Sequence, residues 1–175
     1  MKRFAVVWWC AAVLLAVPGV AAAAAKNGDS SFPLPDGTQL EMHVTANCPL
    51  ADKQCYFTTH ADRRADDGIE GFPNDLWARQ TTTIRSSNRN NYLETQVVAD
   101  NTRQFKTGNY REITTIYFGG GEPEKYQVSG QTQPTDIATG QPMLNADYIV
   151  CAQIQVVYSG VNITSPSTCA QTTFS

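Results

Sequence analysis

The sequence lacks the short motifs by which many enzyme families are recognised. It contains no G-x-S-x-G nucleophile elbow, no H-E-x-x-H zinc motif, no G-x-x-x-x-G-K-S/T phosphate loop and no G-x-G-x-x-G turn after a predicted strand. Histidine is scarce as well, because only His43 and His60 are present, and His43 falls on the polar side of a predicted strand. No catalytic residue is therefore assigned, and no cofactor is expected.

Long apolar runs are missing after the N-terminus, so no membrane span is expected in the mature chain. At the N-terminus itself, the positively charged MKR precedes an apolar stretch, Pro18-Gly19 interrupts that stretch, and Ala23 and Ala25 match the small-residue rule for cleavage. An uncleaved anchor is the alternative, because residues 4–25 are long enough to cross a bilayer. We favour a cleaved signal peptide over residues 1–25 and a protein that is secreted or held at the cell envelope.

A strong charge of either sign is also absent. The formal net charge is −3 for the whole chain and −5 once Lys2 and Arg3 are removed with the signal peptide. Such mild acidity favours neither nucleic acid nor anionic lipid as a partner. The remaining length, about 150 residues, suits one domain with its own core. Residues 26–37 are expected to form a flexible N-terminal extension and residues 38–175 the folded domain.

The cysteines lack the C-x-x-C spacing that is typical of zinc sites and redox centres. Four cysteines remain after the signal peptide, and an even number in an exported chain indicates disulfides. Cys48 and Cys55 flank the loop of a predicted hairpin. Near the C-terminus, a two-residue turn at Ser159-Gly160 and a single bulge in the returning strand would align Cys151 with Cys169. We therefore predict the disulfides Cys48–Cys55 and Cys151–Cys169.

Helical signals are few, whereas alternating strands are frequent. Leu40, Met42 and Val44 alternate with polar neighbours, and the segment 148–158 presents a hydrophobic side chain at every second position. The segment 60–71, HADRRADDGIEG, could hold one helical turn. Short strands with frequent turn signals predict an all-β fold, a single-domain antiparallel β-sandwich of immunoglobulin-like architecture, with a β-barrel as second choice.

The segment 75–99 carries the most specific surface feature. Two alternating stretches are joined by the polar sequence SSNRNN, which predicts a hairpin. An exposed face of Trp, Tyr and Arg has the composition of binding hot spots and could bind a protein or glycan partner. Coverage of both faces by other parts of the fold is the alternative, and it is favoured. The residues of the candidate face are Trp77, Arg79, Arg85, Arg89 and Tyr92.

Several carboxylates are clustered in the stretch DRRADDGIE and raise the question of a calcium site. Calcium takes six to eight oxygen ligands, which an EF-hand supplies at alternating positions. The spacing here departs from that pattern and two arginines interrupt it, so a solvated, ion-paired loop is the favoured interpretation. The carboxylates concerned are Asp62, Asp66, Asp67 and Glu70.

Three segments resemble parts of small exported proteins from mycobacteria and related actinobacteria. They are GFPNDLWARQTTTIRSSNRNNYLE, TTIYFGGGEPEKYQ and IVCAQIQVVYSGVNITSPSTCAQTTF, and the likeness covers most of the mature chain. None of these segments is a catalytic signature, and the resemblance brings neither an assigned activity nor a functional residue. It implies a secreted or envelope location.

Two classes of function follow from these features. The favoured class is a non-catalytic, disulfide-bonded module that binds a partner or has a structural role at the cell envelope or outside the cell. The alternative is a hydrolase of envelope polymers with an acidic cleft, whose two carboxylates the sequence does not identify. A cleft that joins two carboxylates would favour the enzyme, whereas a flat face carrying Trp77, Arg85 and Tyr92 would favour binding.

Overall fold

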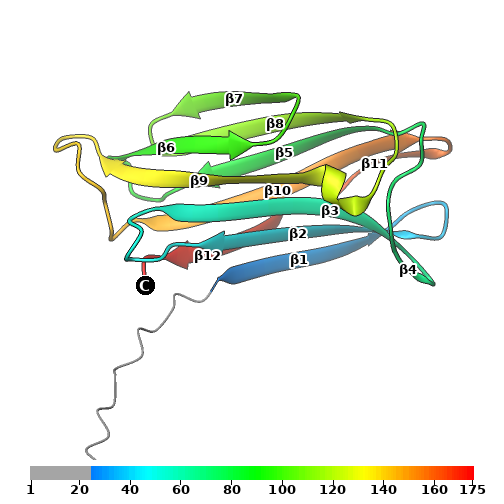
Figure 1. The fold of residues 1–175 in the computed structure, drawn as a ribbon, viewed down its shortest axis with the longest axis horizontal. Helices are drawn as coiled ribbons and strands as arrows, with labels where there is room; N and C mark the ends of the chain where they lie inside the picture. Colours follow the sequence, from blue (N-terminus) through cyan, green and yellow to red (C-terminus); the bar gives the residue numbers. More distant parts are fainter. Residues whose placement is uncertain (1–24) are drawn as a thin grey trace, which may run out of the picture.

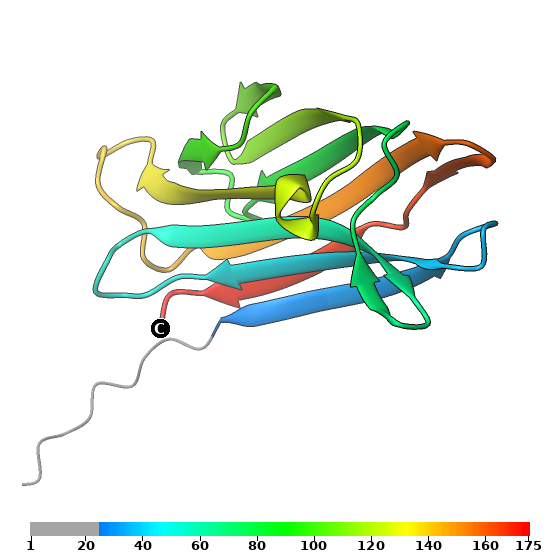
Figure 2. The same ribbon diagram turned by 45° about the vertical axis from the view of Figure 1, so that its right-hand side comes forward.

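The computed structural model describes residues 25–175, so the predicted signal peptide lies outside the described residues except for Ala25. Within this range the chain forms two antiparallel sheets that pack face to face and do not close into a barrel (Figures 1 and 2). The predicted all-β sandwich is confirmed.

Each sheet has six strands: five follow one another in a row, and the sixth pairs with one of these five. The first sheet runs β1 (Lys26–Pro33), β2 (Gln39–Asn47), β3 (Cys55–Ala65), β9 (Gln127–Asp136) and β6 (Asn91–Val98), and β4 (Gly68–Glu70) pairs with β3. The second sheet runs β11 (Val161–Thr164), β10 (Asp147–Tyr158), β5 (Trp77–Arg85), β8 (Tyr110–Phe118) and β7 (Thr102–Thr107), and β12 (Thr168–Thr173) pairs with β10. A short 3-10 helix, η1 (Pro123–Tyr126), precedes β9.

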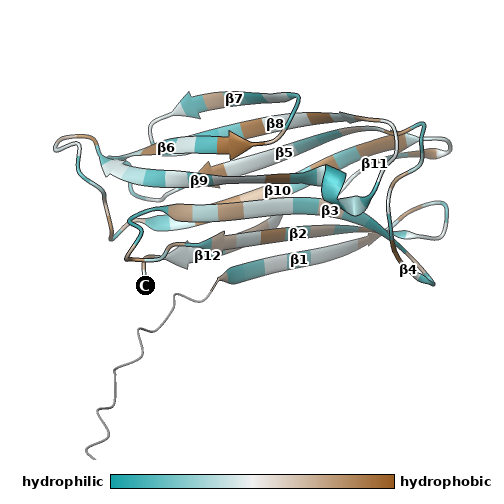
Figure 3. Ribbon diagram, viewed as in Figure 1, coloured by the Kyte–Doolittle hydropathy of each residue, from teal (hydrophilic) through white to brown (hydrophobic). Residues whose placement is uncertain are grey.

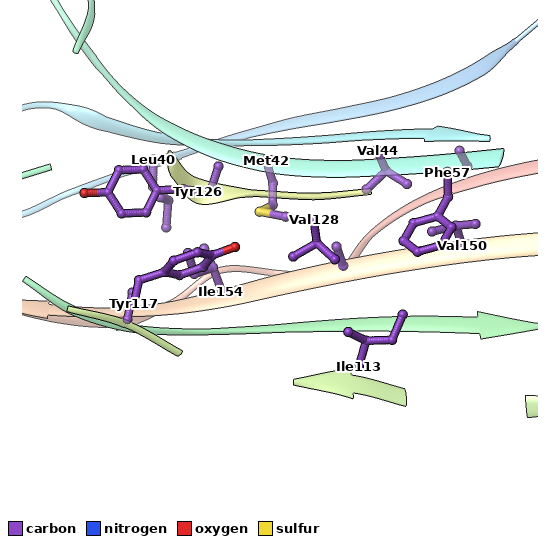
Figure 4. Close-up of a cluster of buried hydrophobic side chains, with 14 of the residues drawn as sticks. Leu40, Met42, Val44, Phe57, Ile113, Tyr117, Tyr126, Val128, Val150 and Ile154 are labelled. Carbon is purple, nitrogen blue, oxygen red and sulfur yellow. The ribbon is translucent and has the colours of Figure 1, made fainter. Parts of the chain in front are cut away.

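Side chains alternate between the core and the surface along most strands, which Figure 3 shows as alternating hydrophobic and hydrophilic bands. Successive side chains of a strand point to opposite faces, so alternation buries one face of each sheet. Figure 4 shows Met42 and Val44 of β2 facing Val150 and Ile154 of β10 in the space between the sheets. The residues that were predicted to point inward in segments 40–44 and 148–158 are all buried.

Both predicted disulfides are confirmed. Cys48–Cys55 connects the end of β2 to the start of β3, and Cys151–Cys169 connects β10 to β12. Cys151 and Cys169 are directly paired across the two strands, whereas the pairing of β10 with β11 runs one residue out of step with that register. This one-residue shift is the predicted bulge.

The predicted hairpin over residues 75–99 is wrong. β5 pairs with β10 and β8 in one sheet, β6 pairs with β9 in the other, and residues 86–90 cross between the sheets. Both stretches do alternate as strands, with Ala78 and Leu93 buried, but alternation does not reveal which strand lies next to which. Packed sheets are about 10 Å apart, a distance that a short extended connection can span.

The predicted flexible extension is also wrong, because residues 26–33 form the edge strand β1, which pairs with β2 along its whole length. The close approach of β1 to the opposite sheet requires a glycine. A Cβ atom at Gly28 would lie 2.2 Å from the carbonyl oxygen of Cys169, so only glycine lets β1 pack against β12.

The helical turn considered for residues 60–71 is absent. β3 continues to Ala65, and a tight turn leads into β4, which pairs back onto β3 (Figure 1). Among residues 25–175, η1 is the only helix, and no helix in that range is long and apolar enough to cross a membrane.

Candidate functional site

Four ionisable side chains gather on the outer face of the β2–β3 hairpin. Antiparallel pairing places His43 directly opposite His60 and Glu41 directly opposite Asp62. Because side chains alternate along each strand, all four project from the same face, away from the core. We call this arrangement of two imidazoles and two carboxylates the histidine–carboxylate cluster.

The polar atoms of the cluster converge. Oδ2 of Asp62 lies 3.0 Å from Nε2 of His60 and 3.6 Å from Nε2 of His43. The two imidazole rings stack with centroids 5.1 Å apart, and one ligand atom from each of the three residues lies within 4.8 Å of the other two. Ligands bound about 2.0–2.1 Å from a tetrahedral zinc ion lie about 3.3 Å from one another. The observed separations are close to that value for Asp62 with either histidine.

Asp62 is buried although it lies on the outer face, and its side chain is 1% exposed. His60 approaches it without hydrogen-bond geometry, and neither carboxylate oxygen of Asp62 has a hydrogen-bond partner. The two imidazoles are the nearest polar groups to it, and a buried carboxylate that accepts no hydrogen bond is unfavourable. Glu41, directly opposite, adds a second carboxylate, and like charges across a strand pair repel. A bound cation would relieve both penalties.

Neighbouring charged residues orient two members of the cluster. Nδ1 of His43 lies 2.7 Å from Oδ1 of Asp29 in β1, so the other ring nitrogen is directed toward Asp62. Nε of Arg64 donates a hydrogen bond to Oε1 of Glu41 at 2.7 Å. This bond, together with the negative charges of Glu41 and Asp62, raises the pKa of the Arg64 guanidinium. A carboxylate on the far nitrogen of a ligating histidine fixes the ring and increases its basicity.

Formal charge and donor type indicate the same kind of ligand. The carboxylates of Asp29, Glu41 and Asp62 lie around His43, and Arg64 pairs with Glu41, which leaves two negative charges when the imidazoles are neutral. Imidazole and carboxylate together suit zinc and other first-row transition metals, whereas calcium and magnesium take oxygen ligands. The cluster can therefore hold a divalent transition-metal ion.

The acidic segment considered for calcium does not converge on one point. Asp66 and Asp67 are exposed at the turn between β3 and β4, and Glu70 forms an ion pair with Arg63. Glu70 pairs across the strands with Arg63, whose side chain points to the face opposite to that of Asp62. Asp62 alone of the four belongs to the histidine–carboxylate cluster.

The candidate aromatic and arginine face is divided between the two sheets. Trp77, Arg79 and Arg85 lie on β5, whereas Tyr92 lies on β6 in the opposite sheet. Arg85 and Arg89 line a shallow hollow of about 600 Å³ beside the crossing connection. The continuous face expected from a 75–99 hairpin is therefore wrong, because the hairpin itself does not form.

The histidines were not predicted to act together because they lie far apart in the chain. The signal was nevertheless present in the first disulfide. Antiparallel pairing keeps the sum of the two paired residue numbers constant, and Cys48–Cys55 has the same sum as His43–His60. A hairpin clipped by that disulfide therefore places the two histidines opposite each other.

The chain matches no protein-family model and no curated protein. The chemistry of the histidine–carboxylate cluster is accordingly inferred from its geometry.

Proposed function

We propose that the protein is an exported, non-catalytic binding module that captures a divalent transition-metal ion, best matched by zinc, at the histidine–carboxylate cluster. The observation that carries this proposal is the buried carboxylate of Asp62, which lies beside the Nε2 atoms of His43 and His60 and has no hydrogen-bond partner. An ion bound there would balance the charge of the carboxylate and give its oxygens a bonding partner.

Export is supported by the two disulfides, since disulfides form and persist in oxidising compartments. The signal-peptide pattern and the resemblance to small exported actinobacterial proteins favour the same location, secreted or at the cell envelope. All four cysteines among the described residues are disulfide-bonded, so imidazole and carboxylate are the donors left for a metal ion there. A disulfide-bonded hairpin also keeps the two histidines in register.

Zinc titration of the oxidised, chelator-treated protein by isothermal calorimetry tests this proposal. We expect one high-affinity zinc ion per chain. At a free zinc concentration of 100 times Kd, thermal unfolding should show a stabilisation of about 2.7 kcal/mol. The double variant His43→Ala/His60→Ala should lose both the binding and the stabilisation, because it removes both nitrogen ligands.

The matched control is Thr45→Ala/Thr58→Ala, which removes the next cross-strand pair on the same face of the same hairpin. This control should bind zinc with unchanged affinity. Calcium and magnesium should give no stabilisation at the same concentrations, because they bind imidazole poorly. Zinc binding that survives in the double histidine variant, or that is lost equally in the threonine control, would contradict the proposal.

A further inference from the structure

Glu41 has one carboxylate oxygen engaged and the other free. Oε1 accepts the hydrogen bond from Arg64, whereas Oε2 is buried without a partner, 3.8 Å from Nε2 of His43. We infer that Glu41 is the fourth ligand of the metal site and closes it around the ion. This inference rests on the proposed function and specifies what kind of site it is.

Glu41 stands just outside the group of three converging residues. The ligand atoms that lie within 4.8 Å of one another belong to His43, His60 and Asp62, without Glu41. Because ligands of a tetrahedral ion are about 3.3 Å apart at bond lengths of about 2.0–2.1 Å, Oε2 has to move inward from its present position. Rotation about the side-chain bonds of Glu41 provides this movement, and Arg64, whose side chain is 44% exposed, is free to follow.

Arg64 determines how Glu41 binds. Its hydrogen bond occupies Oε1, so Oε2 alone is directed toward the ion and the carboxylate binds through one oxygen. The same device acts on the other side of the site, where Asp29 holds the far ring nitrogen of His43. Contacts of this kind orient ligands without touching the metal. Arg64 and Asp29 are therefore positioning residues.

A fourth protein ligand separates a closed site from a hydrolytic one. Catalytic zinc sites keep three protein ligands and a water molecule in the fourth position, whereas structural sites are closed by four. With Glu41 bound, the ion has two nitrogen and two oxygen ligands, and no position remains at which water could be activated. The site retains the ion and does not hydrolyse a substrate, which distinguishes a binding module from an envelope-polymer hydrolase.

Cobalt(II) in place of zinc tests the fourth ligand, because tetrahedral cobalt absorbs visible light strongly and the position of its bands depends on which atoms bind the ion. We expect intense visible bands for the wild-type protein. Glu41→Gln should shift these bands and lower the affinity by more than about 100-fold, the upper end of what loss of a positioning residue costs, because it removes a ligand and leaves water in its place. Arg64→Ala should lower the affinity by about 10-fold and leave the bands in place, because it removes a positioning residue and no ligand.

The matched control is Glu94→Gln, which neutralises an exposed carboxylate of β6 in the same sheet and should change neither the bands nor the affinity. Melting curves in chelator establish that each variant folds. Glu41→Asp, which keeps the charge but shortens the reach of the carboxylate, replaces Glu41→Gln if the latter unfolds, and it should shift the bands in the same way.

The outcomes separate this inference from the proposed function. Unchanged bands and affinity in Glu41→Gln, or weak bands in the wild-type protein, would show that Glu41 is not the fourth ligand. In either case, loss of cobalt binding in His43→Ala/His60→Ala would still support the metal site. Failure of the wild-type protein to bind either cobalt or zinc would overturn both.

Discussion

Two connections in this protein have similar sequence character and different structures. The segment between β2 and β3 and the segment between β5 and β6 both contain turn-forming polar residues and both join strands with alternating side chains. The first closes a hairpin that is clipped by Cys48–Cys55, whereas the second crosses from one sheet to the other. Local turn chemistry does not decide between these outcomes.

Contacts that are distant in sequence decide the second connection. The backbone of Ser86 exchanges hydrogen bonds with Asn109, through its N–H to the Asn109 carbonyl and through its C=O to the Asn109 side-chain amide, and the Ser86 hydroxyl donates to Asp147. Asn109 directly precedes β8 and Asp147 begins β10, and these two strands flank β5 in its sheet. Because both edges of β5 are occupied, β6 has to pair elsewhere.

The largest effect is expected in β10, the strand that occupies one edge of β5. Ile154→Asp should lower the free energy of unfolding by more than about 4 kcal/mol, because it buries an unpaired charge at a side chain with no exposed surface. Gln153→Asp introduces the same charge on the exposed face of the same strand and should cost less than about 1 kcal/mol. Urea denaturation followed by circular dichroism measures both, and equal losses would contradict the assignment of faces.

The two disulfides should differ in their effects, because only the first lies in the hairpin that carries the metal ligands. The chain-entropy model gives a loss of about 2.4 kcal/mol for Cys48→Ala/Cys55→Ala and about 3.2 kcal/mol for Cys151→Ala/Cys169→Ala. We expect the first variant to lose at least about tenfold in zinc affinity, since its hairpin carries the ligands, and the second to retain full affinity despite its larger loss of stability. Denaturation and calorimetry on both variants test this, and equal zinc affinities would show that the clip does not hold the site.

The substitution Asp147→Ala should destabilise the protein, because Asp147 holds the connection between β5 and β6. Burial pushes the pKa of Asp147 upward, but hydrogen bonds from Ser86 and Ser87 outweigh this effect and hold the pKa below its usual range. The variant should lose about 1–3 kcal/mol of unfolding free energy at neutral pH.

The pH dependence of this loss follows from the direction of the pKa shift. A lowered folded-state pKa stabilises the protein above the unfolded-state value of about 3.9, and the contribution disappears as the pH falls through the folded-state pKa. The difference in stability between wild type and Asp147→Ala should therefore shrink below about pH 4. A difference between wild type and Asp147→Ala that stays constant down to about pH 2 would contradict the role of Asp147.

The smallest effect is expected for His43→Ala without metal. The imidazole is 31% exposed and its partner Asp29 is 65% exposed, and ion pairs of this kind contribute about 0–1 kcal/mol. Melting curves in chelator should therefore nearly coincide with those of the wild-type protein, whereas added zinc should stabilise only the wild type. A large loss in chelator would mean that His43 has a structural role in the hairpin.

Much of the fold was predictable because alternation is a local property. The directions of Met42 and Ile154 follow from the two-residue period of a strand, and the pairing of Cys151 with Cys169 follows from a short turn and one bulge. Less of the candidate site could be predicted from the sequence. Its register was implied by the first disulfide, but the lack of a hydrogen-bond partner for Asp62 could be found only from coordinates.

The sequence by itself determined the all-β class, the two disulfides and the side of each strand that is buried, because these depend on neighbours within a few residues or across one turn. Only the tertiary structure decided that β5 and β6 belong to different sheets and that Asp62 is buried on an outer face. Both results depend on segments that are distant in sequence. β8 and β10 occupy the edges of β5, and η1 and β4 contact β3, the strand that carries Asp62. Which distant segments pack together is set by the burial of the whole core, which no local pattern specifies.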